Sequence, residues 1–383
     1  MSAQSCKFIF MCRRQGVFKK NITQGNDLQP QSWSHRRSFF WIGLAVLALV
    51  LKQIVPPSFW DQWYYEGVFT WIRRVSGVLL SWSPVPLIYM GVSVILVRTA
   101  FWITQRKRGM AFMVLRALGG LGAMVTLFYV LWGFNYGQMA LDRRLGLELS
   151  KATPEEMEVE FRRATTVLLE EAQRLPENMT SDQAIRNFEI NDLDVRPDVV
   201  KALQVLGLPN AGCVRVRQLW PSGFLLRWNT AGIYIPHVLE GHIDKGLLSV
   251  QKPFTIAHEM AHGYGVTDEG ACNFVAWLAC SRSDNQWVRF GGALTYWRYS
   301  TTSMPWDSVA PVLRAFPPVL QRTVELINEN DRKYPDILPE WRDAVYATYL
   351  KGHGVAHGLR SYNDVVVMVQ QYLARQLPAE GPD

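Results

Sequence analysis

Three long apolar segments in the first third of the chain limit its possible folds more than any other feature. They run from Phe39 to Val55, from Val85 to Ile103 and from Phe112 to Phe134. A helix of about 20 mostly apolar residues is long enough to cross the hydrocarbon core of a bilayer. A large soluble core could also bury such segments, but three in succession favour the membrane. The sequence therefore predicts a three-helix transmembrane region over residues 39–136, with the lipid bilayer as its partner.

The distribution of positive charge predicts how these helices are oriented. The chain has a formal net charge of +7, and much of the excess lies in residues 1–38 and in Arg106-Lys107-Arg108. Because both segments flank apolar runs, their charge is typical of cytoplasmic helix ends rather than of a nucleic-acid-binding surface. We therefore expect residues 1–38 to be a basic cytoplasmic segment, and the chain after about residue 136 to lie outside the cytoplasm. No nucleic acid partner is expected.

The loop at residues 56–84 lies between the first two apolar segments and is expected outside the cytoplasm. It is crowded with large aromatic side chains, namely Trp60, Trp63, Tyr64, Tyr65, Phe69 and Trp71. Such a composition suits an amphipathic helix that lies in the membrane interface. It suits equally well a loop that packs against the rest of the protein, and the sequence leaves both possibilities open.

Residues 137–383 have the composition of an ordinary soluble domain. Thr153 followed by Pro154 is typical of a helix start. After Pro253 the pattern is helical almost to the end of the chain. Between these regions we expect short strands at three places, namely Val214–Arg217, Phe224–Leu226 and Gly232–Ile235. A small sheet combined with many helices predicts an α+β fold for this part of the chain.

The segment His258-Glu259-Met260-Ala261-His262 has the spacing of a metal site. Two histidines four residues apart project from one face of a helix and can bind the same ion. Neutral imidazoles are common zinc ligands, and a glutamate beside them can accept a proton and pass it to a leaving group. Two surface histidines beside a solvated glutamate are the alternative. The motif predicts zinc bound by His258 and His262, with Glu259 as general base.

A third ligand requires the chain to turn after His262. If the helix continued, Glu269 would lie about 10 Å further along its axis, too far to share the metal. Gly263 and Gly265 can end the helix, because glycine adopts left-handed backbone angles easily. The sequence therefore predicts a turn at this point, followed by an acidic ligand.

Two adjacent carboxylates compete for this role. Asp268 gives the metzincin spacing HExxHxxGxxD, in which the last ligand comes from a loop. Glu269 could instead reach the metal from a new helix that is capped by Thr267 and carries Asn273 one turn later as a partner of a ligand. We expect Glu269 to be the third ligand, and Asp268 is the alternative.

Further motifs lie on both sides of the histidine pair. They are Trp132-Gly133-Phe134-Asn135-Tyr136, Gly232-Ile233-Tyr234-Ile235-Pro236, Pro253-Phe254-Thr255-Ile256, Glu269 with Asn273-Phe274, Tyr349-Leu350-Lys351 and Gly358-Leu359-Arg360-Ser361-Tyr362. In this order they resemble the DUF3810 family of bacterial membrane proteins, which are zincin-like and of uncharacterised function. The chain departs from the family pattern at Gly263-Tyr264, where the family usually has Gln-Arg.

The resemblance implies a zincin-like catalytic domain, in which a twisted sheet lies above the active-site helix and a second helix brings the third ligand. It places that ligand at Glu269, and it implies a multi-pass protein of the bacterial inner membrane. Zincins often use a His, Tyr or Arg to stabilise the oxyanion. His357 and Tyr362, near the family-like C-terminal motif, are the candidates, with packing or capping as the alternative.

Together these features predict a membrane-anchored zinc metallopeptidase that hydrolyses peptide or protein substrates outside the cytoplasm. The strand at Gly232–Pro236 could pair with an extended substrate. One alternative is an amidase or peptidase that acts on cell-wall peptides. Another is a catalytically silent membrane scaffold that binds zinc. Glu259 argues against the scaffold, because a structural site needs no general base and usually has four protein ligands.

Overall fold

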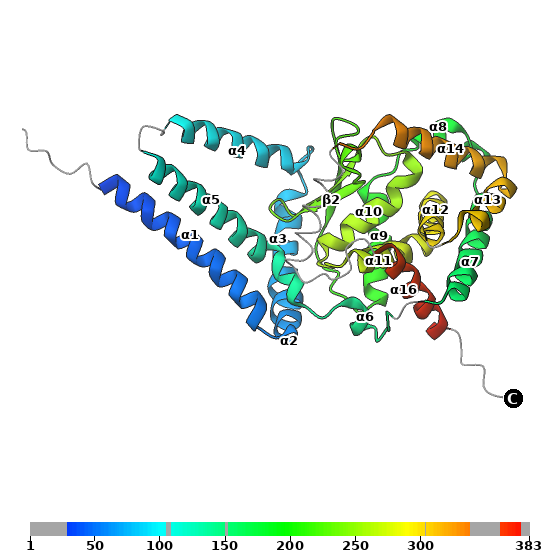
Figure 1. The fold of residues 1–383 in the computed structure, drawn as a ribbon, viewed down its shortest axis with the longest axis horizontal. Helices are drawn as coiled ribbons and strands as arrows, with labels where there is room; N and C mark the ends of the chain where they lie inside the picture. The colour runs from blue at the N-terminus through cyan, green and yellow to red at the C-terminus, as the bar shows by residue number, and fades with distance from the viewer. Residues whose placement is uncertain (1–28, 105–108, 150–151, 303, 338–360, 377–383) are drawn as a thin grey trace, which may run out of the picture.

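Helices make up most of the structure, which is a computed structural model. It describes residues 29–104, 109–149, 152–302, 304–337 and 361–376. Of residues 29–34 and 361–363 it describes the backbone alone. In Figure 1 three long helices extend to one side of a globular part that contains a single small sheet. This agrees with the expected combination of apolar helices, a small sheet and many further helices.

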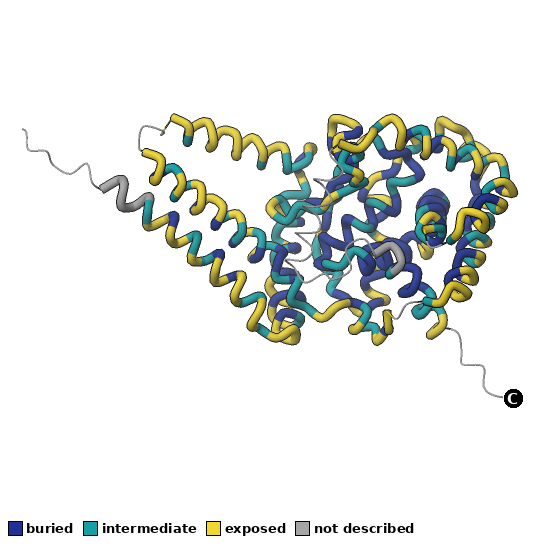
Figure 2. The backbone as a smooth tube through the Cα atoms, viewed as in Figure 1, coloured by how far each residue is buried: buried dark blue, intermediate teal, exposed yellow. Residues whose placement is uncertain are grey.

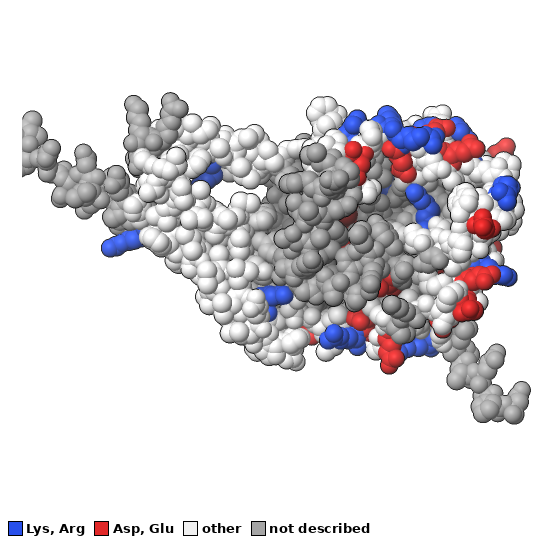
Figure 3. All heavy atoms as spheres, in the orientation of Figure 1, with Lys and Arg blue, Asp and Glu red and all other residues white. Residues whose placement is uncertain are grey.

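The three long helices are apolar enough to cross a membrane. They are α1 (Gln29–Ile54), α4 (Leu87–Thr104) and α5 (Met110–Leu131). The expected spans lie within them apart from a few residues at the ends. Most of their surface is exposed (Figure 2), and the face seen in Figure 3 carries few charged side chains there, whereas charges are frequent on the globular part.

Glycines allow α5 to pack closely against α1. A Cβ atom at Gly119 would lie 2.7 Å from the Cα atom of Ser38, and one at Gly122 would lie 2.8 Å from the backbone oxygen of Trp41. A real Cβ atom does not tolerate such distances, so only glycine permits this approach. In contrast, none of the residues of α4 is buried.

The aromatic loop between α1 and α4 forms helices that pack on the globular part. These are α2 (Pro57–Phe59), the wide π-helix η1 (Trp60–Phe69) and α3 (Thr70–Leu80). Trp60, Tyr64, Tyr65 and Phe69 are buried in the same hydrophobic core as the rest of the protein. Trp63 and Trp71 lie on the outer side, with 66% and 64% of their surface exposed. The core therefore extends across the boundary expected at residues 136 and 137.

The sheet has three strands, with β3 (Glu240–Asp244) between β1 (Arg215–Leu219) and β2 (Gly232–Ile235). β3 runs parallel to β1 and antiparallel to β2. β1 and β2 confirm two of the expected strands, whereas β3 was not predicted. All five of its residues are buried, although three of them are polar.

The prediction of a strand at Phe224–Leu226 is wrong. This segment forms turns that lead into the short 3-10 helix η5 (Leu226–Trp228). The carboxylate of Asp244, at the end of β3, accepts hydrogen bonds from the backbone N–H groups of Gly223, Leu225 and Leu226. These bonds fold the segment around the carboxylate, so its backbone cannot pair with a strand.

The remaining helices enclose the sheet and one another. The bounds of those that precede the sheet are η3 Gly133–Gly137, α6 Leu141–Arg144, α7 Pro154–Gln173, η4 Glu177–Met179, α8 Asp182–Asn187 and α9 Asp192–Val205. Those that follow it are η6 Ser249–Gln251, α10 Lys252–Gly263, α11 Glu269–Ser281, α12 Gln286–Thr301, α13 Trp306–Ala315, α14 Pro318–Lys333 and α16 Ser361–Gln376. The predicted start of α7 is confirmed, since Thr153 and Glu156 form a reciprocal capping box.

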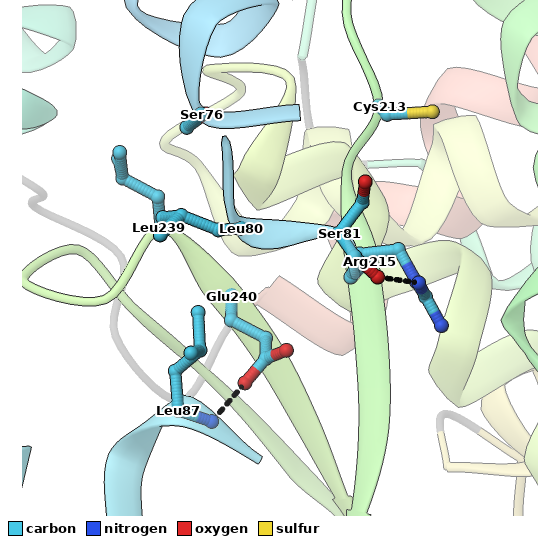
Figure 4. Close-up of a pocket in the computed structure, with 8 residues that line it drawn as sticks. All are labelled: Ser76, Leu80, Ser81, Leu87, Cys213, Arg215, Leu239 and Glu240. Carbon is cyan, nitrogen blue, oxygen red and sulfur yellow. Dashed lines mark hydrogen bonds between the residues drawn. The ribbon is translucent and has the colours of Figure 1, made fainter. Parts of the chain in front are cut away.

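Hydrogen bonds fix the start of α4 and the end of α3 to the sheet (Figure 4). The backbone N–H of Leu87 donates to the carboxylate of Glu240 over 2.8 Å, and the guanidinium of Arg215 donates to the backbone oxygen of Ser81 over 2.8 Å. The pocket between these contacts has a volume of about 10 Å³, which is room for about one water molecule. The apolar helix α4 is therefore anchored to β3, and helix α3 is anchored to β1.

Candidate metal centre

Helix α10 presents both histidines of the motif. Pro253 lies in its first turn, where a missing N–H costs nothing. The helix ends at Gly263, and Gly265 has a φ of +97°, which favours glycine. A side chain at Gly265 would also meet the ring of Tyr65 at 2.7 Å. The turn expected after His262 is therefore confirmed.

A second helix, α11, begins directly after this turn with Glu269 as its first residue. The residue that caps it is Asp268, whose carboxylate accepts a hydrogen bond of 2.9 Å from the N–H of Ala271. The expectation that Thr267 caps the helix is wrong by one residue. Because Asp268 has the extended backbone of an N-cap, its carboxylate is turned towards the first turn of α11.

His258, His262 and Glu269 lie together in the structure. Their possible ligand atoms all lie within 4.8 Å of one another. The Oε2 atom of Glu269 is 3.2 Å from Nε2 of His258 and 3.6 Å from Nε2 of His262. Ligands about 2.1 Å from a tetrahedral zinc ion lie roughly 3.4 Å apart. The spacing therefore fits one metal ion, and within the described residues the cluster has three members.

The electrostatics of the cluster also suit a cation. Burial raises the pKa of Glu269, but the two adjacent histidines outweigh it and hold this pKa well below its usual range. Glu269 is thus a carboxylate at neutral pH. Two imidazoles and one carboxylate are a known donor set of catalytic zinc sites, where the fourth position stays open for water or substrate.

The other ring nitrogen of each histidine is hydrogen-bonded. The Nδ1 atom of His258 donates to the side-chain oxygen of Asn273 over 2.8 Å, and Nδ1 of His262 donates to the backbone oxygen of Val266 over 3.0 Å. A carbonyl oxygen can only accept, so the proton is on Nδ1 in both rings. When the second proton of each ring is released, as metal binding requires, the lone pairs of both Nε2 atoms lie beside Glu269 and are available to a metal.

Asn273 was expected to contact a candidate ligand, and in the structure it is hydrogen-bonded to His258. It has a second donor, the hydroxyl group of Tyr299, which lies 3.3 Å from the same oxygen. Tyr299 comes from α12, and nothing in the sequence near it indicates a place in this network. The buried thiol of Cys272 also approaches Nδ1 of His262, at 3.3 Å.

Glu259 lies beside the cluster and is almost fully buried, with 4% of its surface exposed. Its Oε2 atom has no hydrogen-bond partner among the described residues. Burial raises its pKa to about 7, although the two histidines act to lower it. A Cβ atom at Gly232 in β2 would lie only 2.6 Å from its Oε1 atom, so the carboxylate rests against the backbone of the edge strand.

The two candidates for oxyanion stabilisation remain untested. His357 lies outside the described residues. Tyr362 belongs to the first turn of α16, and its side chain is likewise outside the description.

A family model described as "Protein of unknown function (DUF3810)" matches residues 64–369, which include the whole candidate centre. No curated protein and no solved structure matches the chain significantly.

Proposed function

The chain belongs to the DUF3810 family, and we propose that this member is a membrane-anchored zinc metallopeptidase with a zincin-like catalytic domain. The ligands are His258, His262 and Glu269, and the general base is Glu259. One observation carries the proposal, namely that three donor groups lie within 4.8 Å of one another beside the buried carboxylate of Glu259, whose Oε2 atom has no hydrogen-bond partner among the described residues.

The chain's own residues account for the chemistry that such a site needs. A zinc ion, when bound, supplies a Lewis acid that polarises the scissile carbonyl group. Asn273 and the backbone oxygen of Val266 hold protons on Nδ1 of the two histidines, which directs each Nε2 towards the ion. Glu259 accepts a proton from the attacking water and passes it to the leaving nitrogen. Burial raises its pKa above the usual range of a carboxyl group, which helps it to hold the proton and return it.

The state of Glu259 favours an enzyme over a zinc-binding scaffold. A buried carboxylate without a partner costs stability, because its charged form loses hydration. A scaffold gains nothing from that cost, whereas a general base requires a carboxylate placed next to the reacting water. A structural zinc site also usually has four protein ligands, and among the described residues this cluster has three.

The position of β2 favours a peptide as the substrate. Within the described sheet, β2 is an edge strand, because it pairs only with β3. Gly232, its first residue, lies against the carboxylate of Glu259. An extended peptide that added to this edge would therefore bring its backbone next to the general base. This geometry suits a polypeptide better than a compact small molecule.

The test has two parts, both on the full-length protein. Purified wild-type protein should contain about one zinc ion per chain, and the double variant His258→Ala, His262→Ala should contain none.

In cell membranes, new protein N-termini should form with the wild type and not with Glu259→Gln, which should keep its zinc. Products that are muropeptides instead would assign the activity to the cell wall. Identical products from wild type and Glu259→Gln would contradict the proposal.

A further inference from the structure

The C-terminal end of α10 is bound by three side chains from the N-terminal part of the chain. Trp132 Nε1 donates to the backbone oxygen of His262 over 2.7 Å. Arg73 Nη1 donates to the oxygen of Tyr264 over 2.8 Å, and Gln138 Nε2 donates to that of Gly265 over 2.6 Å. The last carbonyl groups of a helix have no partners within it. Trp132 therefore binds a carbonyl group of the last turn of α10, and Arg73 and Gln138 bind the two carbonyl groups that follow Gly263.

These donors come from the segments next to the apolar helices, residues 57–80 and 132–138, which we call the membrane-proximal segments. Trp132 directly follows α5, Arg73 lies in α3, and Gln138 follows η3. Trp132 and Arg73 are each only 3% exposed. The positive charge of Arg73 also suits this place, because the C-terminal end of a helix carries the negative end of its dipole and attracts a cation.

Trp132 acts on the peptide group of a candidate ligand itself. Its ring centroid lies 6.3 Å from that of His262, and its N–H shares the backbone oxygen of His262 with the N–H of Gly265. The oxygen that fixes the His262 ring, on Val266, belongs to the same turn. A shift of this turn would therefore move both the backbone of His262 and the acceptor that orients its ring.

We infer that the membrane-proximal segments complete the metal centre, with Trp132 as a positioning residue for His262. This inference rests on the proposed function, since it concerns the same three ligands. In physical terms, the N–H of Trp132 holds Nε2 of His262 at a fixed place relative to His258 and Glu269. Zinc affinity thus depends on a residue that directly follows a candidate membrane helix, not only on the helices that carry the ligands.

The experiment measures zinc affinity of the full-length protein in detergent, by competition with a chelator of known affinity. Trp132→Phe keeps an aromatic ring and removes the N–H. We expect it to bind zinc roughly tenfold more weakly, the loss that follows when an outer partner of a ligand is removed. The visible spectrum of the cobalt-substituted protein should also change, because the spectrum reports ligand geometry. Trp63→Phe, at an exposed position of η1, is the matched control and should change neither.

Gln138→Met provides a second variant in case Trp132→Phe does not fold. It removes a donor to Gly265, outside α10, so we expect a smaller loss of affinity than for Trp132→Phe. Wild-type affinity and an unchanged cobalt spectrum in Trp132→Phe would overturn the inference, even if its unfolding temperature fell. If Trp132→Phe is unfolded, wild-type affinity in Gln138→Met would overturn it. A wild-type protein without zinc would instead reject the proposed function, and the inference with it.

Discussion

The Nδ1 atom of His258 lies 2.8 Å from the side-chain oxygen of Asn273, one turn beyond Glu269 on α11. Residues four apart on a helix share a face. One face of α11 therefore supplies both a candidate ligand, Glu269, and the acceptor that orients another, His258. The two helices are coupled through this hydrogen bond as well as through the cluster itself.

The first prediction concerns this acceptor. Asn273→Leu keeps a similar size but removes the oxygen, so His258 loses the bond that orients its ring. We expect zinc affinity to fall by about tenfold or more. Asn273→Asp keeps an acceptor at the same place and should bind zinc at least as tightly as the wild type. Competition with a chelator measures both, and wild-type affinity in Asn273→Leu would contradict the assigned role.

The second prediction separates the two adjacent carboxylates. Glu269→Gln replaces a charged ligand with a neutral amide, so the protein should lose most of its zinc. Asp268→Asn should keep it, because asparagine caps a helix about as well as aspartate does. Zinc content measured by mass spectrometry on both variants decides the matter. Loss of metal from Asp268→Asn alone would make the site metzincin-like.

Local sequence patterns were sufficient to predict the apolar helices, the histidine helix and the turn that ends it. Each depends on residues close together in the chain, such as the histidine spacing or the glycines after His262. The cap of α11 shows the limit of this approach. Thr267 and Asp268 are both good capping residues, and the backbone after Gly265 decides between them.

The central strand was not predicted, because its five residues include three polar side chains and a glycine and only one β-branched residue, which is a weak strand signal. Glu240 and Asp244 are tolerated inside because distant groups satisfy them. Arg217 and the N–H of Leu87 bind Glu240, and the N–H groups of Gly223, Leu225 and Leu226 bind Asp244. The contact of Trp132 with His262 likewise joins residues 130 positions apart. No local pattern indicates such pairs.

The third prediction concerns pH and His242, which is fully buried in β3. Burial and the charge of Arg217 lower its pKa from 6.5 to about 4. Between these values the unfolded chain binds a proton that the folded protein does not, so stability falls as pH falls. The difference between the two pKa values corresponds to a loss of roughly 3 kcal/mol in the free energy of unfolding. Unfolding in detergent at pH 7 and pH 4 should show this loss in the wild type and a smaller one in His242→Phe. Equal losses would contradict the prediction.

The fourth prediction concerns orientation. The basic N-terminal segment and Arg106-Lys107-Arg108 favour the cytoplasm. A reporter fused after residue 150 should therefore be active only when the assay detects extracytoplasmic protein. A fusion after Arg108 should give the opposite result and serves as the control. Cytoplasmic activity of the fusion after residue 150 would reject the proposed location of the catalytic part.

The last prediction concerns the contact between the edge strand and the general base. A Cβ atom at Gly232 would lie 2.6 Å from Oε1 of Glu259 and 2.9 Å from the backbone oxygen of His242. Because both distances are too short for a methyl group, Gly232→Ala must displace either the strand or the carboxylate.

A misplacement of about 1 Å can reduce turnover by roughly a hundredfold. With a peptide identified from the cleavage products, kcat of Gly232→Ala should therefore fall by about that factor. Zinc content should be unchanged, because Gly232 meets Glu259 and not the three ligands. Ile233→Val, at the exposed neighbouring position, is the control and should keep wild-type kcat. Full turnover in Gly232→Ala would show that Glu259 does not need its present position, and loss of zinc would show that β2 supports the ligands instead.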